Sequence, residues 1–399
     1  MNIAKWGRFA LALVVGMGAA SAASASEPVE RSGNSFHVAV CARNIGQGEA
    51  RCFAHVVTDA AGNPRLGKSP TATPNVVPSG YGPADLRGAY NIPSSSSIST
   101  IAIVDANGYP NAESDLAVYR SQYGLPACTT GNGCFKKLDQ NGGTNYPRID
   151  VGWAQETALD LDMASAMCPT CKIVLVEASS ASLSNLATAV NTAARQTGVV
   201  AISNSYGGGE TGSSAYNGSY NHSGIAVTVS SGDSGYGVAF PASSQYVIAV
   251  GGTRLTHVAS TGRLWTETAW TSAGSGCSTL YPPVQSGYAF CLNNRMEADI
   301  SAVADPNTGV AVYGPVNRQS SGWQVYGGTS VSSPIIAGIF GNKGVGAASG
   351  SSKIYASASS LFDIQSGSNG SCGGDSRCTA GPGYDGPTGL GTPNGTGAF

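Results

Sequence analysis

From residue 81 almost to its end, the chain alternates short apolar runs with segments of helical periodicity. Apolar runs of the kind found in buried strands cover residues 98–105, 172–177, 198–204, 225–230 and 246–251. Helical patterns lie between them at 113–123, 183–197 and, more briefly, 216–222. This alternation predicts an α/β domain with a mainly parallel sheet covered on both faces, whose functional groups gather at the carboxyl ends of the strands.

The segment before this domain has a different pattern. Residues 36–41 and 52–58 alternate loosely and predict a hairpin closed by a Cys41–Cys52 disulfide. Residues 69–79 contain three prolines and predict a linker. We therefore divide the chain into a short β-rich N-terminal segment at 26–78, a candidate prosegment, and a main domain at 79–399. His37 and His55 lie on the hairpin strands and are interpreted as structural.

The first 25 residues are typical of a secretory signal peptide. Lys5 and Arg8 precede the apolar run Phe9–Val15, and small residues follow as far as Ala25. That run is too short to span a bilayer, and no later segment reaches about 18 uninterrupted apolar residues. We therefore expect a secreted, extracellular protein that is not embedded in a membrane.

Composition narrows the classes of function. The chain has 399 residues, 41% of them hydrophobic, which is enough to fill a sizeable core. Only 11% are charged and the net charge is −2, so the clustered basic surface expected of a nucleic-acid-binding protein is not indicated.

The ten cysteines fall into close pairs and agree with export. Short-range disulfides are the simple interpretation. The alternative is a zinc site built partly from Cys168 and Cys171, although no other pair shows their two-residue spacing. The predicted pairs are Cys41/Cys52, Cys128/Cys134, Cys168/Cys171, Cys277/Cys291 and Cys372/Cys378.

In the stretch Tyr326-Gly-Gly-Thr-Ser330-Val-Ser-Ser-Pro334, a serine lies at the predicted start of an apolar helix. At a helix start, free backbone N–H groups and the positive end of the helix dipole stabilise developing negative charge, which makes Ser330 a candidate nucleophile. Pro334 is tolerated because its missing N–H forfeits only the bond to the Ser330 carbonyl. The alternative is that Ser330 is an ordinary N-capping serine.

Two carboxylates share one face of a predicted helix that follows Gly152. Glu156 and Asp160 are four residues apart, whereas Asp162 points elsewhere and is interpreted as structural. Neighbouring carboxyls with separated pKa values provide one route to acid–base chemistry. The alternative is a solvated helix face.

A third candidate follows the strand at 225–230. Asp233, in Ser-Gly-Asp-Ser-Gly, lies where an active-site residue of a parallel sheet is expected, although an Asx-turn would explain it equally well. Serine nucleophiles usually have a histidine base. His257 gives the order Asp233, His257, Ser330 found in subtilisin-type proteases. It lies only 73 residues before Ser330, in what looks like a turn rather than at a helix start.

Together, these three strings resemble the sedolisin family of serine-carboxyl peptidases, whose pattern is Glu-x-x-x-Asp, Ser-Gly-Asp-x-Gly and Gly-Thr-Ser-x-x-x-Pro in this order. The resemblance covers roughly residue 79 to the end. It implies a subtilisin-like three-layer α/β fold and an endopeptidase acting on proteins or peptides, and we expect a monomer. It further implies that Glu156 takes the Ser330 proton and that Asp160 orients Glu156 and relays the proton. A protonated Asp233 would donate, with the Ser330 N–H, to the oxyanion.

The same resemblance implies one structural calcium ion near the C-terminus. Hard oxygen ligands suit Ca²⁺. The implied ligands are the carboxylates of Asp363 and Asp385 and the carbonyls of Ile364, Gly381 and Gly383. The family chemistry implies an acidic pH preference, because one carboxyl must accept a proton while another stays neutral. The alternatives are a subtilisin-type protease that uses His257 and an exported binding protein without catalysis.

Overall fold

The computed structural model describes residues 1, 27–65, 78–259, 262–285, 290–347 and 350–399. The predicted signal peptide, apart from Met1, and most of the predicted linker lie outside the described residues.

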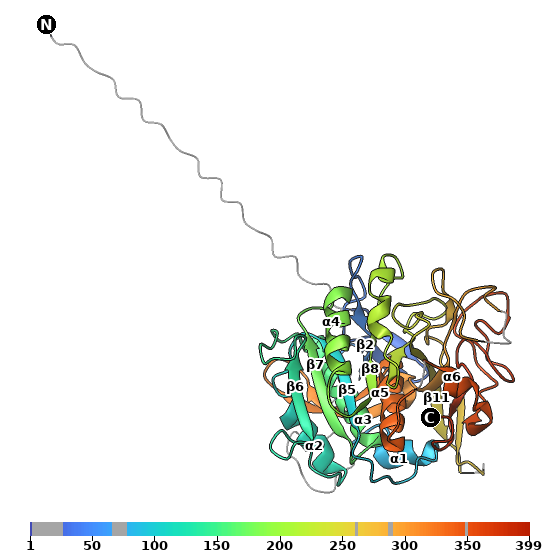
Figure 1. Ribbon diagram of the computed structural model, residues 1–399, viewed down its shortest axis with the longest axis horizontal. Helices are drawn as coiled ribbons and strands as arrows, with labels where there is room; N and C mark the ends of the chain where they lie inside the picture. Colours follow the sequence, from blue (N-terminus) through green and yellow to red (C-terminus); the bar gives the residue numbers. More distant parts are fainter. Residues whose placement is uncertain (2–26, 66–77, 260–261, 286–289, 348–349) are drawn as a thin grey trace.

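An 8-stranded sheet forms the centre of the molecule, in the order β12-β11-β10-β8-β5-β7-β6, with β15 also paired to β11 (Figure 1). Its strands run parallel except for β12, which is antiparallel to β11. All five predicted runs are strands of this sheet, which confirms the mainly parallel α/β prediction. The bounds are β5 Thr100–Ala106, β6 Phe135–Asp139, β7 Lys172–Ala178, β8 Val199–Asn204, β10 Ala226–Ser230, β11 Ile248–His257, β12 Trp265–Ala269 and β15 Ile300–Val303.

Helices cover both faces of the sheet, because successive strand residues point to opposite sides. In β5, Ile101 and Ile103 belong to the apolar cluster that contains α3 and α5, whereas Ala102 and Val104 belong to the cluster that contains α4. The result is the expected three-layer arrangement. The helices are α1 Pro83–Ala89, α2 Ala112–Gln122, α3 Val151–Met167, α4 Leu183–Ala194, α5 Thr329–Lys343 and α6 Ser352–Tyr355, with 3-10 turns at Ser213–Ala215, Asn217–Tyr220, Pro306–Thr308 and Ala358–Ser360.

A second, antiparallel sheet joins the N-terminal segment to the main domain. Its order is β1-β2-β4-β17-β16. The predicted hairpin is confirmed, since Ser35–Ala39 pairs with His55–Thr58, and β4 continues the sheet onto β17 of the main domain. Strands β16 and β17 were not predicted. The remaining bounds are β1 Glu30–Ser32, β2 Ser35–Ala39, β3 Arg51–Cys52, β4 His55–Thr58, β9 Tyr206–Gly207, β13 Gly276–Cys277, β14 Met296–Glu297, β16 Val310–Pro315, β17 Ser321–Gly327, β18 Leu361–Phe362 and β19 Thr392–Pro393.

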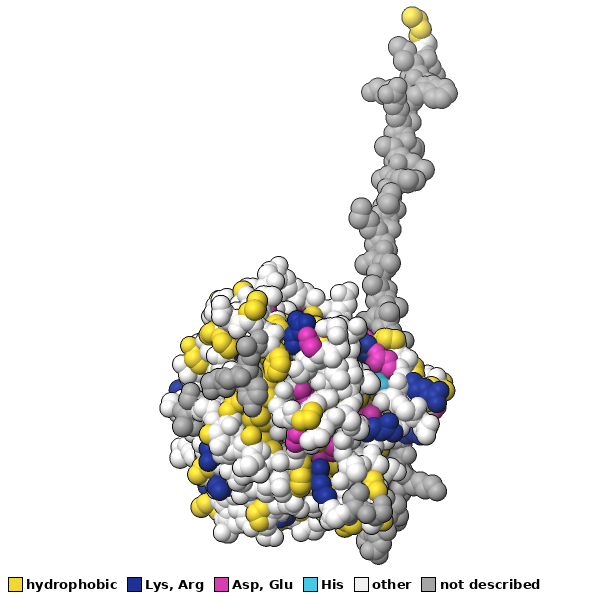
Figure 2. Space-filling view, turned by 90° about the vertical axis from the view of Figure 1, so that its right-hand side faces the viewer, with side chains coloured by type: hydrophobic (Ala, Val, Ile, Leu, Met, Phe, Trp, Pro, Cys, Tyr) yellow, Lys and Arg dark blue, Asp and Glu magenta, His cyan; other side chains and the backbone are white. Residues whose placement is uncertain are grey.

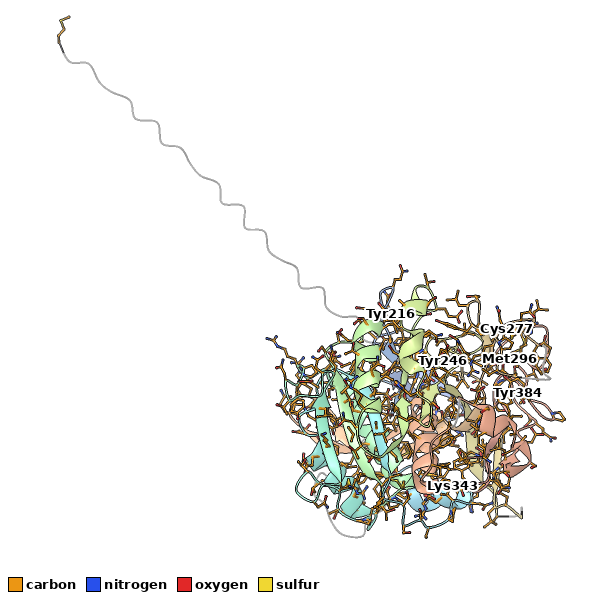
Figure 3. All side chains as sticks on the ribbon, in the orientation of Figure 1. Tyr216, Tyr246, Cys277, Met296, Lys343 and Tyr384 are labelled. Atoms are coloured by element: carbon orange, nitrogen blue, oxygen red, sulfur yellow. A yellow bond between two sulfur atoms is a disulfide. The ribbon has the colours of Figure 1, made fainter. Side chains whose placement is uncertain are left out.

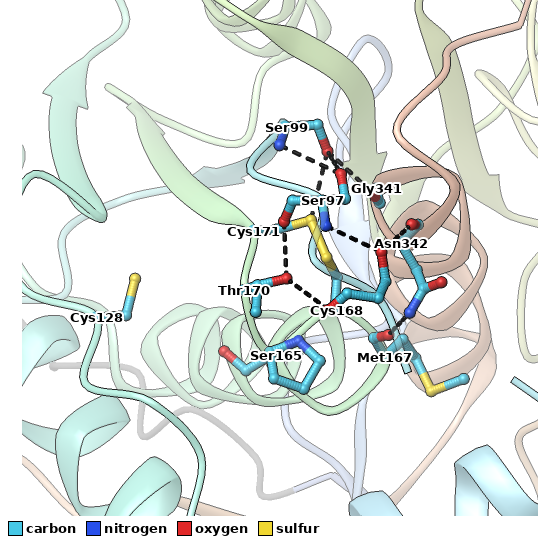
Figure 4. The surroundings of a disulfide bond; sticks show 12 residues. Ser97, Ser99, Cys128, Ser165, Met167, Cys168, Thr170, Cys171, Gly341 and Asn342 are labelled. Atoms are coloured by element: carbon cyan, nitrogen blue, oxygen red, sulfur yellow. Dashed lines mark hydrogen bonds between the residues drawn. A yellow bond between two sulfur atoms is a disulfide. The ribbon is translucent and has the colours of Figure 1, made fainter. Parts of the chain in front are cut away.

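All five predicted disulfides are present. The zinc alternative is wrong, because Cys168 and Cys171 are bonded to each other. Figure 4 shows this disulfide between the end of α3 and the end of α5, where Asn342 Nδ2 donates to the Met167 carbonyl at 3.1 Å. Thr170 Oγ1 donates to the Ser97 carbonyl at 2.7 Å. The Asn342–Met167 bond thus joins the far ends of the two site-bearing helices, and the disulfide closes the turn that follows α3.

The surface agrees with the low charge content. On the face drawn in Figure 2, basic and acidic side chains are interspersed among neutral ones. Side chains fill the space between the layers (Figure 3). None of the helices in the described part of the chain combines the length and the hydropathy that crossing a membrane requires.

Candidate active site

Ser330 lies in the first turn of α5 and is fully buried. The helix begins at Thr329 with Gly328 as its N-cap, so the interpretation of Ser330 as a capping serine is wrong. Gly328 has φ +99°, and a Cβ on it would lie 1.9 Å from the Phe53 carbonyl oxygen. The Ser330 carbonyl, which loses its helical partner because of Pro334, accepts a bond from Ser205 Oγ at 3.4 Å.

Glu156 and Asp160 lie on α3, whose start is capped by Asp150. Both side chains are 0% exposed, so the alternative of a solvated helix face is wrong. Glu156 Oε2 accepts the Ala54 N–H at 2.9 Å, and Asp160 Oδ1 accepts Ser205 Oγ at 2.8 Å. Among the described residues, Glu156 Oε1 and Asp160 Oδ2 have no hydrogen-bond partner. The two carboxyls therefore keep acceptor capacity inside the protein.

The hydroxyl of Ser330 forms hydrogen bonds with two backbone groups. Its Oγ accepts the Phe53 N–H at 3.1 Å and donates to the Ser205 carbonyl at 3.3 Å. A hydroxyl has one proton, so in this arrangement Glu156 does not receive it. The side chains of Ser330 and Glu156 are nevertheless neighbours, and for this reason the Ser330 hydroxyl lowers the pKa of Glu156.

Burial dominates the electrostatics of the carboxyl pair. It raises the pKa of Glu156 well above the ordinary range, and the charge of Asp105 raises it further. Burial, Asp105 and Glu156 likewise raise the pKa of Asp160. The two carboxyls thus interact electrostatically with each other. Such a pair holds a shared proton at a pH where isolated carboxyls would both be ionised.

Asp105 is a third buried carboxyl that sequence reasoning missed. It lies near the carboxyl end of β5, and among the described residues neither of its carboxylate oxygens has a hydrogen-bond partner. Burial raises the pKa of Asp105 to about 7, with the charge of Glu177 adding to the effect and the nearby Thr157 hydroxyl opposing it. The rule that functional groups gather at the carboxyl ends of parallel strands could have identified it.

Asp233 follows β10 and is buried against the start of α5. Its Oδ1 accepts the N–H and the hydroxyl of Thr329 at 2.8 and 2.7 Å. Its Oδ2 lies 3.3 Å from His55 Nε2. A Cβ on Gly328 would be 2.7 Å from this Oδ2 and 1.9 Å from the Phe53 carbonyl oxygen. Both oxygens therefore lie close to Gly328, on the side where a larger residue would carry its side chain. Asp233 therefore fixes the helix start and faces a peptide carbonyl.

The two hairpin histidines form a cluster next to Asp233. His37 Nδ1 and His55 Nδ1 are 2.9 Å apart, and together with Glu30 they bring three ligand-type atoms within 4.8 Å of one another. Burial, followed by the neighbouring His55, lowers the pKa of His37 to about 4. Arg43 forms an ion pair with Glu30, and His55 contacts Asp233, so protein partners already engage two of the three groups.

His257 is not part of this arrangement. It is the exposed last residue of β11 rather than part of a turn, and its ring packs edge-on against Trp265 with centroids 4.9 Å apart. No hydrogen bond or ion pair within the described ranges joins any histidine to Ser330. The structure thus brings Ser330, Glu156 and Asp160 together without His257.

The predicted calcium ligands meet in two neighbouring C-terminal loops. Asp363 Oδ2 accepts the Gly383 N–H, and Asp385 Oδ2 accepts the Gly381 N–H, both at 3.0 Å. Burial raises the pKa of Asp385 to about 7, and the charge of Asp363 contributes. No ion pair within the described residues neutralises either carboxylate. Two close carboxylates in a carbonyl-rich loop fit a hard divalent cation.

The loop that carries Asp385 is anchored to the domain. Tyr384 and Met296, both labelled in Figure 3, come from the two segments that meet here, and the Tyr384 hydroxyl donates to the Met296 carbonyl at 3.3 Å.

This fold and this serine–carboxyl arrangement define the class of protein. The subtilase family model matches residues 143–370, and the chain belongs to the subtilase family. Its resemblance to the sedolisin-type members of that family is confirmed by two relatives. Over 364 residues it is 31% identical to kumamolisin of Bacillus sp. (strain MN-32), covering 80% of this chain and 63% of kumamolisin. Over 203 residues it is 34% identical to sedolisin of Pseudomonas sp. (strain 101), covering 42% of this chain and 33% of sedolisin. The chain therefore spans less than two thirds of the length of either relative.

Solved structures give the same result. Pseudomonas sedolisin, a serine-carboxyl proteinase complexed with two molecules of pseudo-iodotyrostatin, matches with a TM-score of 0.66 at 26% identity, covering 80% of this chain and 96% of that one. A lanthipeptide protease matches with a TM-score of 0.50 at 14% identity over 79% of this chain and 92% of that one, which supports the fold alone.

Proposed function

We propose that this protein is a secreted endopeptidase in which Ser330 attacks peptide bonds with the help of buried carboxyls. The observation that carries the proposal is the position of Glu156, a buried carboxyl with one unpaired oxygen, next to a serine in the first turn of α5. A base that shares a proton with Asp160 takes the proton of the serine during attack. Asp160, whose Oδ1 accepts a hydrogen bond from Ser205, interacts electrostatically with Glu156, orients this base and keeps the proton that the pair shared before the attack.

Asp233 supplies the oxyanion donor in this proposal. Its Oδ2 faces the place where a peptide carbonyl lies, next to the start of α5. A protonated carboxyl there, together with the Ser330 N–H, donates to the developing negative charge in a site from which water is excluded. Asp105 acts through Glu156 and Asp160: in its ionised form it favours the protonated forms of both carboxyls, so it is a positioning residue.

A peptide aldehyde tests the proposal directly, because its adduct with a serine mimics the tetrahedral intermediate. The folded protein should digest a denatured protein substrate, and a stoichiometric amount of aldehyde should abolish this activity. If a folded sample neither digests the substrate nor binds the aldehyde, the alternative of an exported binding protein replaces the proposal.

The dependence of activity on pH follows from the raised pKa values. Activity requires the Glu156–Asp160 pair to hold one proton, so it falls at low pH, where both groups are protonated, and at high pH, where neither is. Because burial raises the pKa of both groups, the alkaline limb should lie above the ordinary carboxyl pKa of 4.5. The measurement is kcat/KM against pH for a peptide substrate, and the expected profile has an acidic maximum.

The control for this profile is His257→Ala, which should leave both limbs in place. A profile that rises through pH 7 and loses that limb in His257→Ala would instead support a subtilisin-type mechanism.

Export and calcium complete the proposal. The N-terminal sequence pattern and five disulfides support secretion. The carboxylates of Asp363 and Asp385 and the carbonyls of Ile364, Gly381 and Gly383 would hold one calcium ion. The ion would neutralise the two carboxylates and tie their loops together.

Removal of calcium should therefore lower the melting temperature. At a free calcium concentration of 100 times Kd, binding to the folded state adds about 2.7 kcal/mol, which for a chain of this size corresponds to a few degrees. Thermal unfolding with and without EGTA measures the shift. Asp385→Asn should melt at the lower temperature under both conditions. Asp375→Asn, a change at an exposed aspartate paired with Arg377, should respond to EGTA like the wild type.

A further inference from the structure

Three side chains of metal-binding type lie on one face of the N-terminal sheet. In the antiparallel pairing of β1 with β2, Glu30 lies directly opposite His37. In the pairing of β2 with β4, His37 lies opposite Val57. His55 is two residues before Val57 on the same strand, so its side chain lies on the same face as that of His37. The register of the three strands therefore brings one carboxylate and two imidazoles together.

The ligand atoms of these side chains converge. His37 Nδ1 and His55 Nδ1 are 2.9 Å apart, and Glu30 Oε2 lies 3.9 Å from His37 Nδ1. One ligand atom from each residue lies within 4.8 Å of the other two. Two nitrogen ligands of a tetrahedral zinc ion lie about 3.3 Å apart, so the two rings need to separate by only about 0.4 Å. A movement of the Glu30 carboxylate by about 1.5 Å completes three ligands, and water can take the fourth position.

Neighbouring groups orient two of the three ligands. Glu30 pairs through Oε1 with Arg43, which leaves Oε2 toward His37. His55 Nε2 lies 3.3 Å from Asp233 Oδ2. Among the described residues neither of these two atoms has a hydrogen-bond partner, so a proton on Nε2 faces this carboxylate. The lone pair of His55 is then on Nδ1, directed at His37. Histidines that bind metals commonly present their other N–H to a carboxylate in this way.

Burial and solvent access also suit a bound cation. His37 is 2% exposed and His55 is 1% exposed. Burial favours the neutral ring, which is the form that binds metals. The side chain of Glu30 is 29% exposed, which gives an ion a path from solvent to the two rings. Arg43 also lies close to Glu27, so its positive charge is shared between two carboxylates.

The simpler explanation of the histidine contact is a single proton. At 2.9 Å, one Nδ1 atom carries a proton and donates it to the other. A metal ion would replace this proton, because a nitrogen that binds a metal must be unprotonated. A histidine pair alone does not require a carboxylate oxygen directed at the same point, nor a second carboxylate behind His55. These two carboxylates, from Glu30 and Asp233, favour the metal.

We propose that Glu30, His37 and His55 bind one divalent transition-metal ion of the zinc type. Two imidazoles and one carboxylate, with one position open to water, form a ligand set that suits zinc, whereas calcium prefers oxygen ligands. The bound ion joins β1, β2 and β4 and holds the His55 ring beside Asp233. The inference concerns the N-terminal sheet and does not depend on the proposed peptidase function.

The test is a calorimetric titration of the folded full-length chain with zinc chloride at neutral pH. Excess calcium is present, so that a calcium site is filled beforehand. The wild type should bind one zinc ion per chain. His37→Ala and His55→Ala should each bind zinc at least about 100-fold more weakly, because loss of a ligand exceeds the 10- to 100-fold effect, roughly, of losing a group that orients a ligand.

Two control variants address the other places where zinc could bind. His257→Ala removes an exposed histidine of β11, and Asp385→Asn changes the proposed calcium site. Both should bind zinc like the wild type. Three results would overturn the proposal: a folded wild type that binds no zinc, binding that persists in both His37→Ala and His55→Ala, and binding that is lost in Asp385→Asn.

Hydrogen–deuterium exchange of the wild type locates the ion without relying on the folding of any variant. Zinc should slow the exchange of backbone amides in residues 30–39 and 55–58, because the ion restrains the opening of these strands. Exchange in the loops at 363–385 should not change. Protection only outside the three strands, or none at all, would show that the histidine pair holds a proton and not a metal.

Discussion

Ser330→Ala is expected to reduce kcat/KM for a peptide substrate by at least about 10⁴-fold, because loss of a nucleophile removes the covalent route. Folding should be little affected. Within the described residues, the Ser330 hydroxyl makes hydrogen bonds at 3.1 and 3.3 Å, and the substitution leaves the bond of the Ser330 carbonyl to Ser205 unchanged. Initial rates and thermal melts of the two proteins are the measurements.

Ser332→Ala is the matched control. Ser332 is buried on the same helix, but its hydroxyl donates to the Thr329 carbonyl at 2.7 Å and not to the carboxyl pair. The variant should lose about 1 kcal/mol of stability and keep its activity. Full activity in a folded Ser330→Ala protein, or equal losses in both variants, would contradict the assignment of the nucleophile.

Glu156→Gln is expected to lower kcat/KM by about 10³-fold or more. The amide keeps the size of the side chain and can still accept the Ala54 N–H, but it cannot take a proton from Ser330. Because the substitution also removes one member of the proton-sharing pair, the residual activity should lose the alkaline limb of the wild-type pH profile. Initial rates across pH measure both effects.

Asp162→Asn separates this chemistry from the burial of a carboxyl. Asp162 lies on α3 two residues after Asp160, is equally buried, and accepts the Tyr313 N–H at 3.0 Å. Burial raises its pKa well above the ordinary range, so the neutral amide replaces a group whose protonated form is favoured. This variant should keep activity within about threefold, since it touches no reacting group. A loss as large as that of Glu156→Gln would mean that packing in α3, rather than proton transfer, explains both results.

The sequence by itself determined the layers of the fold and the pairs of cysteines. Apolar runs such as 172–177 have no polar alternation, so they fit only strands covered on both faces, and each predicted run became a strand of the central sheet. Five cysteine pairs close in sequence leave little choice of partner, and all five formed. The spacing of Glu156 and Asp160 placed both on one helix face.

Only the tertiary structure decided what those carboxyls face. Helical spacing cannot distinguish a solvated face from a buried one, and here α3 is covered by α5 and by the N-terminal segment, which removes water from Glu156 and Asp160. Asp105 lies far from them in sequence and joins them through the order of the strands. The path of residues 51–56 could likewise not be predicted from the sequence, because these residues pair with β9 and β17, which lie more than 150 residues further along the chain. Local periodicity records burial and secondary structure, whereas the meeting of distant segments depends on the packing of the whole domain.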